Sequence, residues 1–167
     1  MDFFMWLEQT SVATWVNQSD SVFAYPSILL LHTLGLTLLV GINIAIDLRI
    51  LGFGNRIPVS PLQKFFPLMW CGLAVNASSG VLLLAAKATT MIANPAFYIK
   101  IVSIVLSVVN IFAIRRTVFR DPLLDQRPIQ MTGKFLALTS IFLWLAAITA
   151  GRLMAYVGEA AQFGALN

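Results

Sequence analysis

The sequence predicts an all-α integral membrane protein, a bundle of four hydrophobic helices. Of its 167 residues, 59% are hydrophobic and 11% are charged, and the mean hydropathy is +0.84. Soluble domains carry about 25% charged residues, so this chain has too little polar surface to face water on all sides. Helices are favoured over the strands of a barrel because the apolar runs are continuous, whereas barrel strands alternate apolar and polar residues.

Four apolar runs are long enough to cross a bilayer, whose hydrocarbon core requires about 20 residues per helix. We expect these spans at residues 21–50, 61–87, 95–119 and 131–157, within a single transmembrane domain that covers residues 1–167. Glycine, proline and asparagine residues separate the runs, as at Asn94-Pro95, and such residues are typical of turns.

Residues 3–16 are too short and too mixed in polarity to form a further span. They contain Trp6 and Trp15, and indole rings prefer the boundary between membrane and water. We therefore expect an amphipathic helix that lies at this boundary before the first span.

The basic residues predict the orientation of the spans. Eight of the eleven Lys and Arg residues lie in or beside the connections that follow the first and third spans: Arg49, Arg56, Lys64, Arg115, Arg116, Arg120, Arg127 and Lys134. Lys and Arg collect on the cytoplasmic side of a membrane protein, so both termini are expected on the outer, periplasmic side. This distribution also accounts for the net charge of +4 without a nucleic-acid partner.

Small residues in the first two spans are expected to let helices approach closely, because lipid tails provide no hydrophobic drive for helix association. They are Gly35 and Gly41 in the first span and Gly72, Ser79 and Gly80 in the second. The same faces are candidates for contact with a second copy of the chain or with a larger membrane complex.

Polar residues inside the spans need partners because unpaired polar groups are costly in hydrocarbon. His32 is the only histidine, and Asn43 and Asp47 follow it on the same helix face. The other spans carry further polar residues at helical spacing: Asn76 and Ser79; Lys100, Ser103, Ser107 and Asn110; Ser140, Trp144, Thr149, Arg152 and Tyr156. We expect these four faces to meet around one interior site.

Three of these residues, His32, Lys100 and Arg152, lie in the outer half of their spans. An imidazole with two nearby cations suits a b-type haem, since histidine ligates the iron and the cations bind the propionates. The same groups also suit the oxygen atoms of a quinone. The predicted cofactor site consists of His32, Lys100, Arg152, Asn43 and Tyr156, with His32 as the ligand of the haem iron.

The alternative for His32 is structural, because a membrane histidine also hydrogen-bonds across helices. A second axial haem ligand would come from a methionine, namely Met69, Met91 or Met154, or from another chain. Asp47 has two interpretations as well: it pairs with a neighbouring span, or it admits protons from the cytoplasmic side. With one histidine and few acids, hydrolytic catalysis by this chain alone is not expected.

The chain resembles a family of small, uncharacterised bacterial inner-membrane proteins classed as a domain of unknown function. The residues that carry the resemblance are Tyr25-Pro26, Leu31-His32, Gly41, Asp47-Leu48-Arg49, Leu51-Gly52, Pro67, Trp70, Gly80, Lys100, Asn110, Trp144 and Gly151-Arg152. The resemblance implies four membrane helices, loosely similar to membrane cytochromes and copper-resistance bundles, and no established activity. It also implies an acidic residue before the histidine and, in some members, a histidine in the third span. Residues 29–31 and 110–113 of this chain contain neither.

The sequence therefore predicts a non-catalytic electron-transfer or accessory protein of the inner membrane that binds haem b or a quinone between its helices. Two alternatives remain open. The chain is a structural or assembly subunit whose polar residues serve packing, or it is a small transporter or channel that uses the faces of Asn43, Asn76, Ser107 and Asn110.

Overall fold

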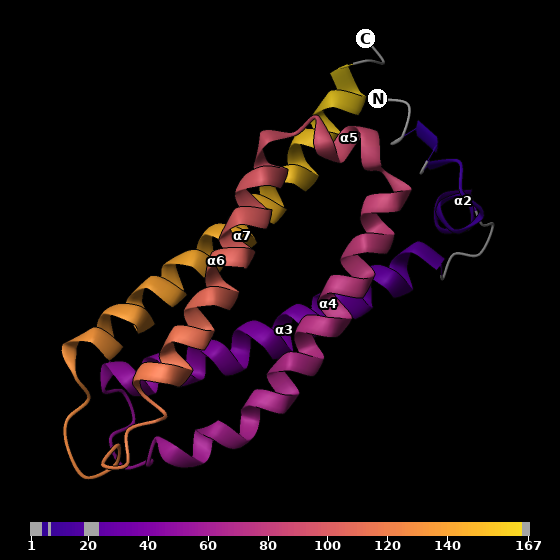
Figure 1. Cartoon of the computed structure of the whole chain (residues 1–167). Coiled ribbons are helices and arrows are strands. Elements are labelled where there is room, and N and C mark those ends of the chain that lie inside the picture. Colours follow the sequence, from indigo (N-terminus) through magenta and orange to yellow (C-terminus); the bar gives the residue numbers. More distant parts are fainter. Residues whose placement is uncertain (1–4, 7, 19–23, 165–167) are drawn as a thin grey trace.

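The computed structural model describes residues 5–6, 8–18 and 24–164 of the chain, and the regular structure in these ranges is helical throughout (Figure 1). This confirms the all-α prediction. In chain order the elements are α2 (Ser11–Gln18), α3 (Ala24–Leu51), the 3₁₀ helix η1 (Ser60–Phe65), α4 (Phe66–Ala86), α5 (Ala88–Ile92), α6 (Pro95–Thr117) and α7 (Met131–Gly164).

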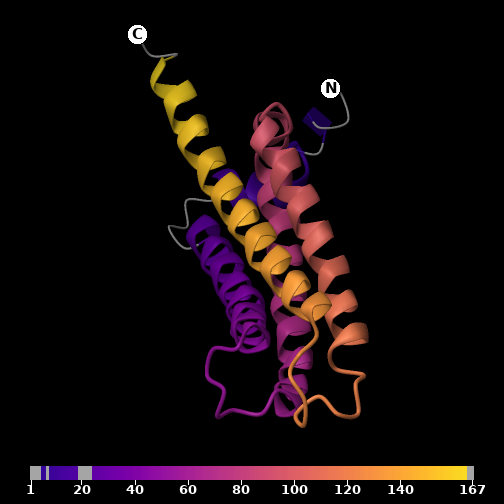
Figure 2. The ribbon, with the colours of Figure 1, turned by 90° about the vertical axis from the view of Figure 1, so that its left-hand side faces the viewer.

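The four long helices pack as two antiparallel hairpins. One consists of α3 and α4, and the other of α6 and α7. The hairpins join mainly through α3 and α7, and Figure 2 shows α7 between α3 and α6. The α4 and α6 helices meet through a Trp70–Phe112 ring contact of 5.2 Å, and they diverge toward the end of the bundle that carries α5 (Figure 1).

Four helical segments are long and apolar enough to cross a membrane: Tyr25–Leu51, Ser60–Ala86, Pro95–Thr117 and Met131–Met154. The predicted number of membrane-length apolar helices is thus confirmed, and their bounds differ slightly from the predicted ones. Residues 21–23 of the first predicted span lie outside the described residues, and α6 ends two residues early, at Thr117. The start of α6 follows from local chemistry, because the Asn94 side chain accepts a hydrogen bond from the backbone of Ala96 and Pro95 occupies the first turn.

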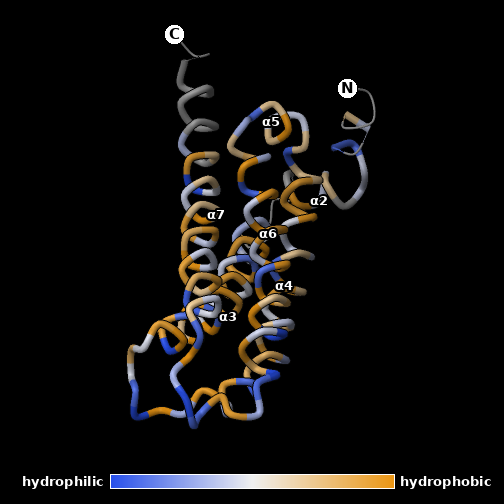
Figure 3. Tube along the Cα trace, turned by 60° about the vertical axis from the view of Figure 1, so that its left-hand side comes forward, coloured by the Kyte–Doolittle hydropathy of each residue, from blue (hydrophilic) through white to orange (hydrophobic). Residues whose placement is uncertain are grey.

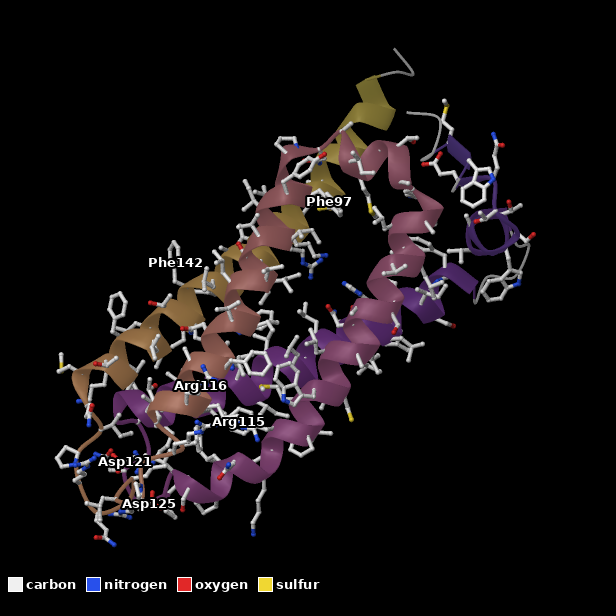
Figure 4. All side chains as sticks on the ribbon, viewed as in Figure 1. Phe97, Arg115, Arg116, Asp121, Asp125 and Phe142 are labelled. Atoms are coloured by element: carbon white, nitrogen blue, oxygen red, sulfur yellow. The ribbon has the colours of Figure 1, made fainter. Side chains whose placement is uncertain are left out.

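The surface of the spans is apolar, which fits lipid rather than water around them. In an 18-residue apolar stretch of each span, between 28% and 33% of the residues are buried inside the bundle. Large apolar side chains cover the rest, including Phe142 with 71% of its surface exposed, which projects away from the bundle in Figure 4. Exposed apolar patches of this extent mark a surface that faces hydrocarbon or another protein.

The two ends of the bundle differ in charge. The α3–η1 and α6–α7 connections lie together at one end, called here the basic end (Figure 1). The α2 helix and the C-terminal part of α7 lie toward the other end, called the terminal end. Hydrophilic residues concentrate at the basic end in Figure 3, and Figure 4 labels Arg115 and Arg116 there on α6. The predicted co-location of the two basic connections is confirmed.

The connections of the basic end are attached to each other by acidic side chains. Asp125 of the α6–α7 connection accepts hydrogen bonds from the backbone N–H groups of Val59, at 2.6 Å, and Ser60, at 3.3 Å, in the other connection. Hydrogen bonds from the Ser60 side chain and these backbone groups hold the pKa of Asp125 below its usual value. Asp121 forms an ion pair of 2.5 Å with Arg127 within its own connection.

The N-terminal segment docks on the terminal end of the bundle. The predicted helix at residues 3–16 is found in part as α2, which lies over α3 and α4 and buries Ala13 and Val16. Trp15 remains 57% exposed, as expected for a residue at a membrane boundary. Before α2, Glu8 accepts hydrogen bonds of 2.8 Å from the backbone and the hydroxyl of Thr89 in α5.

Glycines produce the closest contact between helices, that of α3 with α4. A Cβ atom at Gly35 would lie 2.7 Å from the backbone nitrogen of Asn76, and one at Gly72 would lie 2.9 Å from that of Leu39. The prediction for these two glycines is therefore confirmed. It is wrong for Gly41, which has nothing within 4 Å of its Cβ position because it points away from the bundle.

Replacing Gly35 by alanine is expected to destabilise the protein by about 1–3 kcal/mol, the usual cost of overpacking, because the new methyl group meets backbone that cannot move aside. Gly41→Ala is the matched control on the same helix and should change stability little. Unfolding of both variants in mixed micelles with increasing SDS measures the difference. Equal stability of G35A and wild type would show that α3 and α4 do not touch here.

Candidate functional site

His32 lies on α3 and hydrogen-bonds to α4. Its Nδ1 atom is 3.0 Å from the backbone oxygen of Asn76 and 3.0 Å from the Ser79 hydroxyl. The Asn76 amide in turn donates to the backbone oxygen of His32 at 2.9 Å. Gly80 makes room for the ring, since a Cβ atom there would be 3.2 Å from His32 Cε1. The imidazole is thus held against α4 in one orientation.

These partners determine the tautomer of His32. The backbone oxygen of Asn76 can only accept, and the Ser79 hydroxyl donates its proton to backbone oxygens of its own helix, with Val75 at 2.6 Å. Two acceptors thus lie 3.0 Å from Nδ1, closer than the donor Asn76 Nδ2 at 3.4 Å, and this arrangement favours a proton on Nδ1. The Nε2 atom is then the acceptor of the ring, and its contact with the Asn76 amide is long, at 3.4 Å.

Lys100 extends from α6 across α7 in the terminal half of the bundle. A Cβ atom at Gly151 would be 3.7 Å from Lys100 Cδ, Cε and Nζ, so the absence of a side chain at Gly151 leaves room for the lysine. The charge on Lys100 also acts electrostatically on His32. The ion pair among the described residues joins Asp121 and Arg127, in the α6–α7 connection. Within the same residues, Lys100 therefore has no acidic side chain within ion-pair distance.

Asn43 is the centre of a second polar cluster, between α3 and α7. Its Oδ1 atom accepts hydrogen bonds from the Ser140 hydroxyl at 2.6 Å and from Trp144 Nε1 at 2.9 Å. Because an indole N–H can only donate, the amide oxygen must face Trp144. The amide nitrogen is directed toward Met69 of α4, 3.8 Å from its sulfur. All four side chains are almost fully buried.

Asp47 lies one turn beyond Asn43 and is fully buried. Ser140 is beside its carboxyl group, but neither carboxyl oxygen has a hydrogen-bond partner. The predicted pairing of Asp47 with a neighbouring span is therefore wrong. Arg49, the cation nearest in the chain, hydrogen-bonds instead to the backbone oxygens of Ile57 and Asn55 in the connection that follows α3.

The predicted polar face of α6 is packed against the bundle. Ser103, Ser107 and Asn110 are all buried. Ser107 donates to the backbone oxygen of Ser103 at 2.8 Å, and Asn110 donates to that of Leu136 in α7 at 2.9 Å. The Asn110 bond therefore links α6 to α7, whereas the Ser107 bond stays within α6.

The five residues of the predicted cofactor site occupy separate environments. His32 and Lys100 are in the terminal half, and Arg152 is next to Gly151 but is exposed, as is Tyr156. Asn43 is 11 residues from His32 on α3, about 16 Å along the axis, and belongs to the other cluster. Instead of one polar centre, the bundle thus has one cluster between α3 and α4 and another between α3 and α7. No group of three or more His, Cys, Asp or Glu side chains in the described ranges is arranged to hold a metal ion.

The pairings themselves were not predicted from the sequence. Asn76, Ser79, Ser140 and Trp144 were each expected to face the interior, but nothing in the local pattern linked Asn76 to His32 or Trp144 to Asn43. The inter-loop contacts of Asp125 were not anticipated at all. An acidic residue in a connection that accepts hydrogen bonds from the backbone of another connection is not revealed by any periodic pattern in the sequence.

Breaking the Asn43 cluster is expected to cost stability. Asn43→Leu leaves the Trp144 N–H and the Ser140 hydroxyl without a partner in the interior, a loss of about 1–3 kcal/mol. A double-mutant cycle with Trp144→Phe should give a coupling energy of at least about 0.5 kcal/mol, because the two side chains share a hydrogen bond. Unfolding in SDS measures all four proteins, and strictly additive effects would contradict the contact.

The profile of a family of unknown function, DUF6644, matches residues 3–157, so the chain belongs to that family. This agrees with the resemblance of its sequence to an uncharacterised domain. No curated protein and no solved structure matches the chain.

Proposed function

We propose that this member of a family of unknown function is a non-catalytic membrane component that binds a quinone in the terminal half of its bundle. Lys100 and His32 form the proposed site, and Arg152 lies at its exposed edge, next to Gly151. The protein would then serve as an electron-transfer or accessory component beside an enzyme that reacts with the quinone.

The observation that carries this proposal is the position of Lys100. Its side chain lies over Gly151 with no acidic partner among the described residues, and Arg152 follows Gly151 in the chain. Two cations thus occupy the same level of the bundle. Cations in the apolar part of a membrane need oxygen-bearing partners, which marks such residues as functional candidates.

The chemistry of a quinone suits these groups. Lys and Arg side chains are pure donors, and quinone carbonyl oxygens accept hydrogen bonds. His32 Nε2 is an acceptor, so it suits the hydroxyl group of the reduced quinol instead. The isoprenoid tail of such a molecule dissolves in the lipid that the apolar helix faces are suited to contact.

Haem b suits the described arrangement less well. The His32 ring is packed against α4 between Asn76, Ser79 and Gly80, and the backbones of α3 and α4 meet nearby at Gly35. A macrocycle has no room at this contact. Met69, one of the candidate second ligands, is fully buried beside Asn43 in the other cluster. The geometry therefore favours a quinone over haem.

The proposed location is a bacterial inner membrane, with the basic end in the cytoplasm and both termini outside. The concentration of Lys and Arg in the α3–η1 and α6–α7 connections supports this orientation by the positive-inside rule. The quinone site would then lie in the outer leaflet of the bilayer, on the periplasmic side.

A structural or assembly subunit is the second candidate, favoured by the internal hydrogen bonds of His32 and Asn43. In that case the polar side chains serve to hold the helices together. A transport path receives less support, because Asn43, Asn76, Ser107 and Asn110 all use their hydrogen bonds within the packed bundle.

Quinone binding can be measured by titrating a short-chain ubiquinone analogue into the protein in lipid nanodiscs and following tryptophan fluorescence. Lys100→Met is expected to weaken binding at least tenfold, about 1.4 kcal/mol, because it removes a charged donor. Lys87→Met is the matched control, since Lys87 lies over the Tyr25 ring, 5.5 Å from its centroid, and is not part of the proposed site.

Equal affinity of K100M and wild type, or equal losses in K100M and K87M, would refute the proposal. A structural subunit should show no saturable binding and should copurify with a partner. A Soret absorption band that disappears in His32→Ala would establish haem in place of a quinone.

A further inference from the structure

We propose that Asp47 is a proton-binding group inside the basic half of the bundle, which takes up a proton from water at that end and returns it there. The inference does not depend on the quinone site, which involves other residues in the opposite half of the protein. It starts from the carboxyl group itself, which is fully buried and has no hydrogen bond to either oxygen.

The neighbouring hydrogen bonds favour a protonated Asp47 that donates. Ser140 gives its only proton to Asn43 Oδ1, and Trp144 gives its N–H to the same oxygen. The Ser140 hydroxyl beside Asp47 therefore has only lone pairs left to offer. A carboxylate would face an acceptor, whereas a protonated carboxyl group can donate to it after a small rotation.

No positive charge is paired with Asp47 from any element packed around it. On α3 itself, Arg49 is hydrogen-bonded to loop carbonyls. The α4 helix contains no charged residue, and on α6 the Arg115 guanidinium lies over the Phe66 ring at 5.7 Å. The other cations near the basic end are Arg56, Lys64, Arg116, Arg120, Arg127 and Lys134. None of them forms an ion pair with Asp47, since both of its carboxyl oxygens are unpartnered.

A bound metal cation is a poor alternative. Hard cations require several oxygen ligands, and six to eight are usual for calcium. Here Asn43 Oδ1 already accepts two hydrogen bonds, which leaves the two oxygens of Asp47 and one hydroxyl. A proton needs no further ligand, because it forms one O–H bond with the carboxylate and removes the charge.

The basic end is the shorter route to water. Asp47 is four residues before the end of α3 at Leu51, about 6 Å along the helix axis. A pocket of about 190 Å³ opens at this end, lined by both polar and apolar residues that include Asp121, Arg127 and Gly133. Ile50, one turn from Asp47, lies next to Gly133, with 3.9 Å between Ile50 Cγ2 and the Cβ position of Gly133. Ile50 thus connects the helix turn that carries Asp47 to a residue that lines the pocket.

Infrared spectroscopy of the protein in lipid nanodiscs tests the proposal, because a protonated carboxyl group has a C=O stretching band that a carboxylate lacks. Wild type should show such a band at mildly acidic pH, and the band should disappear reversibly as the pH is raised. It should also shift in D₂O as the proton exchanges. Asp47→Asn, which keeps the shape of the protonated group, should lose the band.

Two further variants make the test specific. Ser140→Ala should retain the band at a shifted frequency, because the acceptor beside Asp47 is lost. Glu8→Gln, which changes a carboxyl group at the terminal end of the bundle, should leave it unchanged. The proposal is overturned if wild type and D47N have identical spectra throughout the titration. It is also overturned if sodium or potassium removes the band at constant pH, which would make the site a cation site.

Discussion

The structure depends on one constraint, that polar side chains within four apolar helices must find their partners inside the protein. Hydrocarbon offers no hydrogen bonds, so the contacts between helices are organised by these groups as well as by apolar packing. His32 links α3 to α4, Asn43 links α3 to α7, and Asn110 links α6 to α7. Each principal helix contact therefore contains at least one hydrogen bond between polar groups.

Among the described residues, two ionisable side chains lack a partner inside the protein, and the functional proposals rest on them. Lys100 has no acidic partner, and Asp47 has no partner for either oxygen. They lie in opposite halves of the bundle, so they cannot neutralise each other. Among the buried side-chain atoms of the described residues, those without a hydrogen-bond partner are the two carboxyl oxygens of Asp47, and Lys100 is half-buried. These are the two positions where a proton or a ligand would complete the structure.

The sequence was sufficient to predict the number of spans and the common end of the basic connections, because hydropathy and charge are properties of each segment alone. The direction in which an individual residue points from its helix was harder to predict. Gly35 and Gly41 are in the same helix, but only Gly35 meets α4. Arg152 and Tyr156 followed a polar pattern on the fourth span and yet point outward, because a pattern does not show which neighbouring helix covers it.

Pairings between helices depend on contacts that no local signal contains. Asn43 and Ser140 are separated by 97 residues, and their hydrogen bond exists because α7 crosses α3 at that level. The predicted single polar centre assumed that all four helices present their polar faces at one depth. In the structure α3 contributes to two clusters at different depths, which is why His32 and Asn43 are apart.

The most direct test of this account is whether lipid surrounds the helices. A spin label at Phe142, on the exposed face of α7, can be compared with one at Gln126 in the exposed α6–α7 connection, using collision with oxygen and with a water-soluble nickel complex in proteoliposomes. We expect the label at residue 142 to collide mainly with oxygen and the label at residue 126 mainly with nickel. Equal access of the nickel complex to both labels would contradict a membrane-spanning bundle.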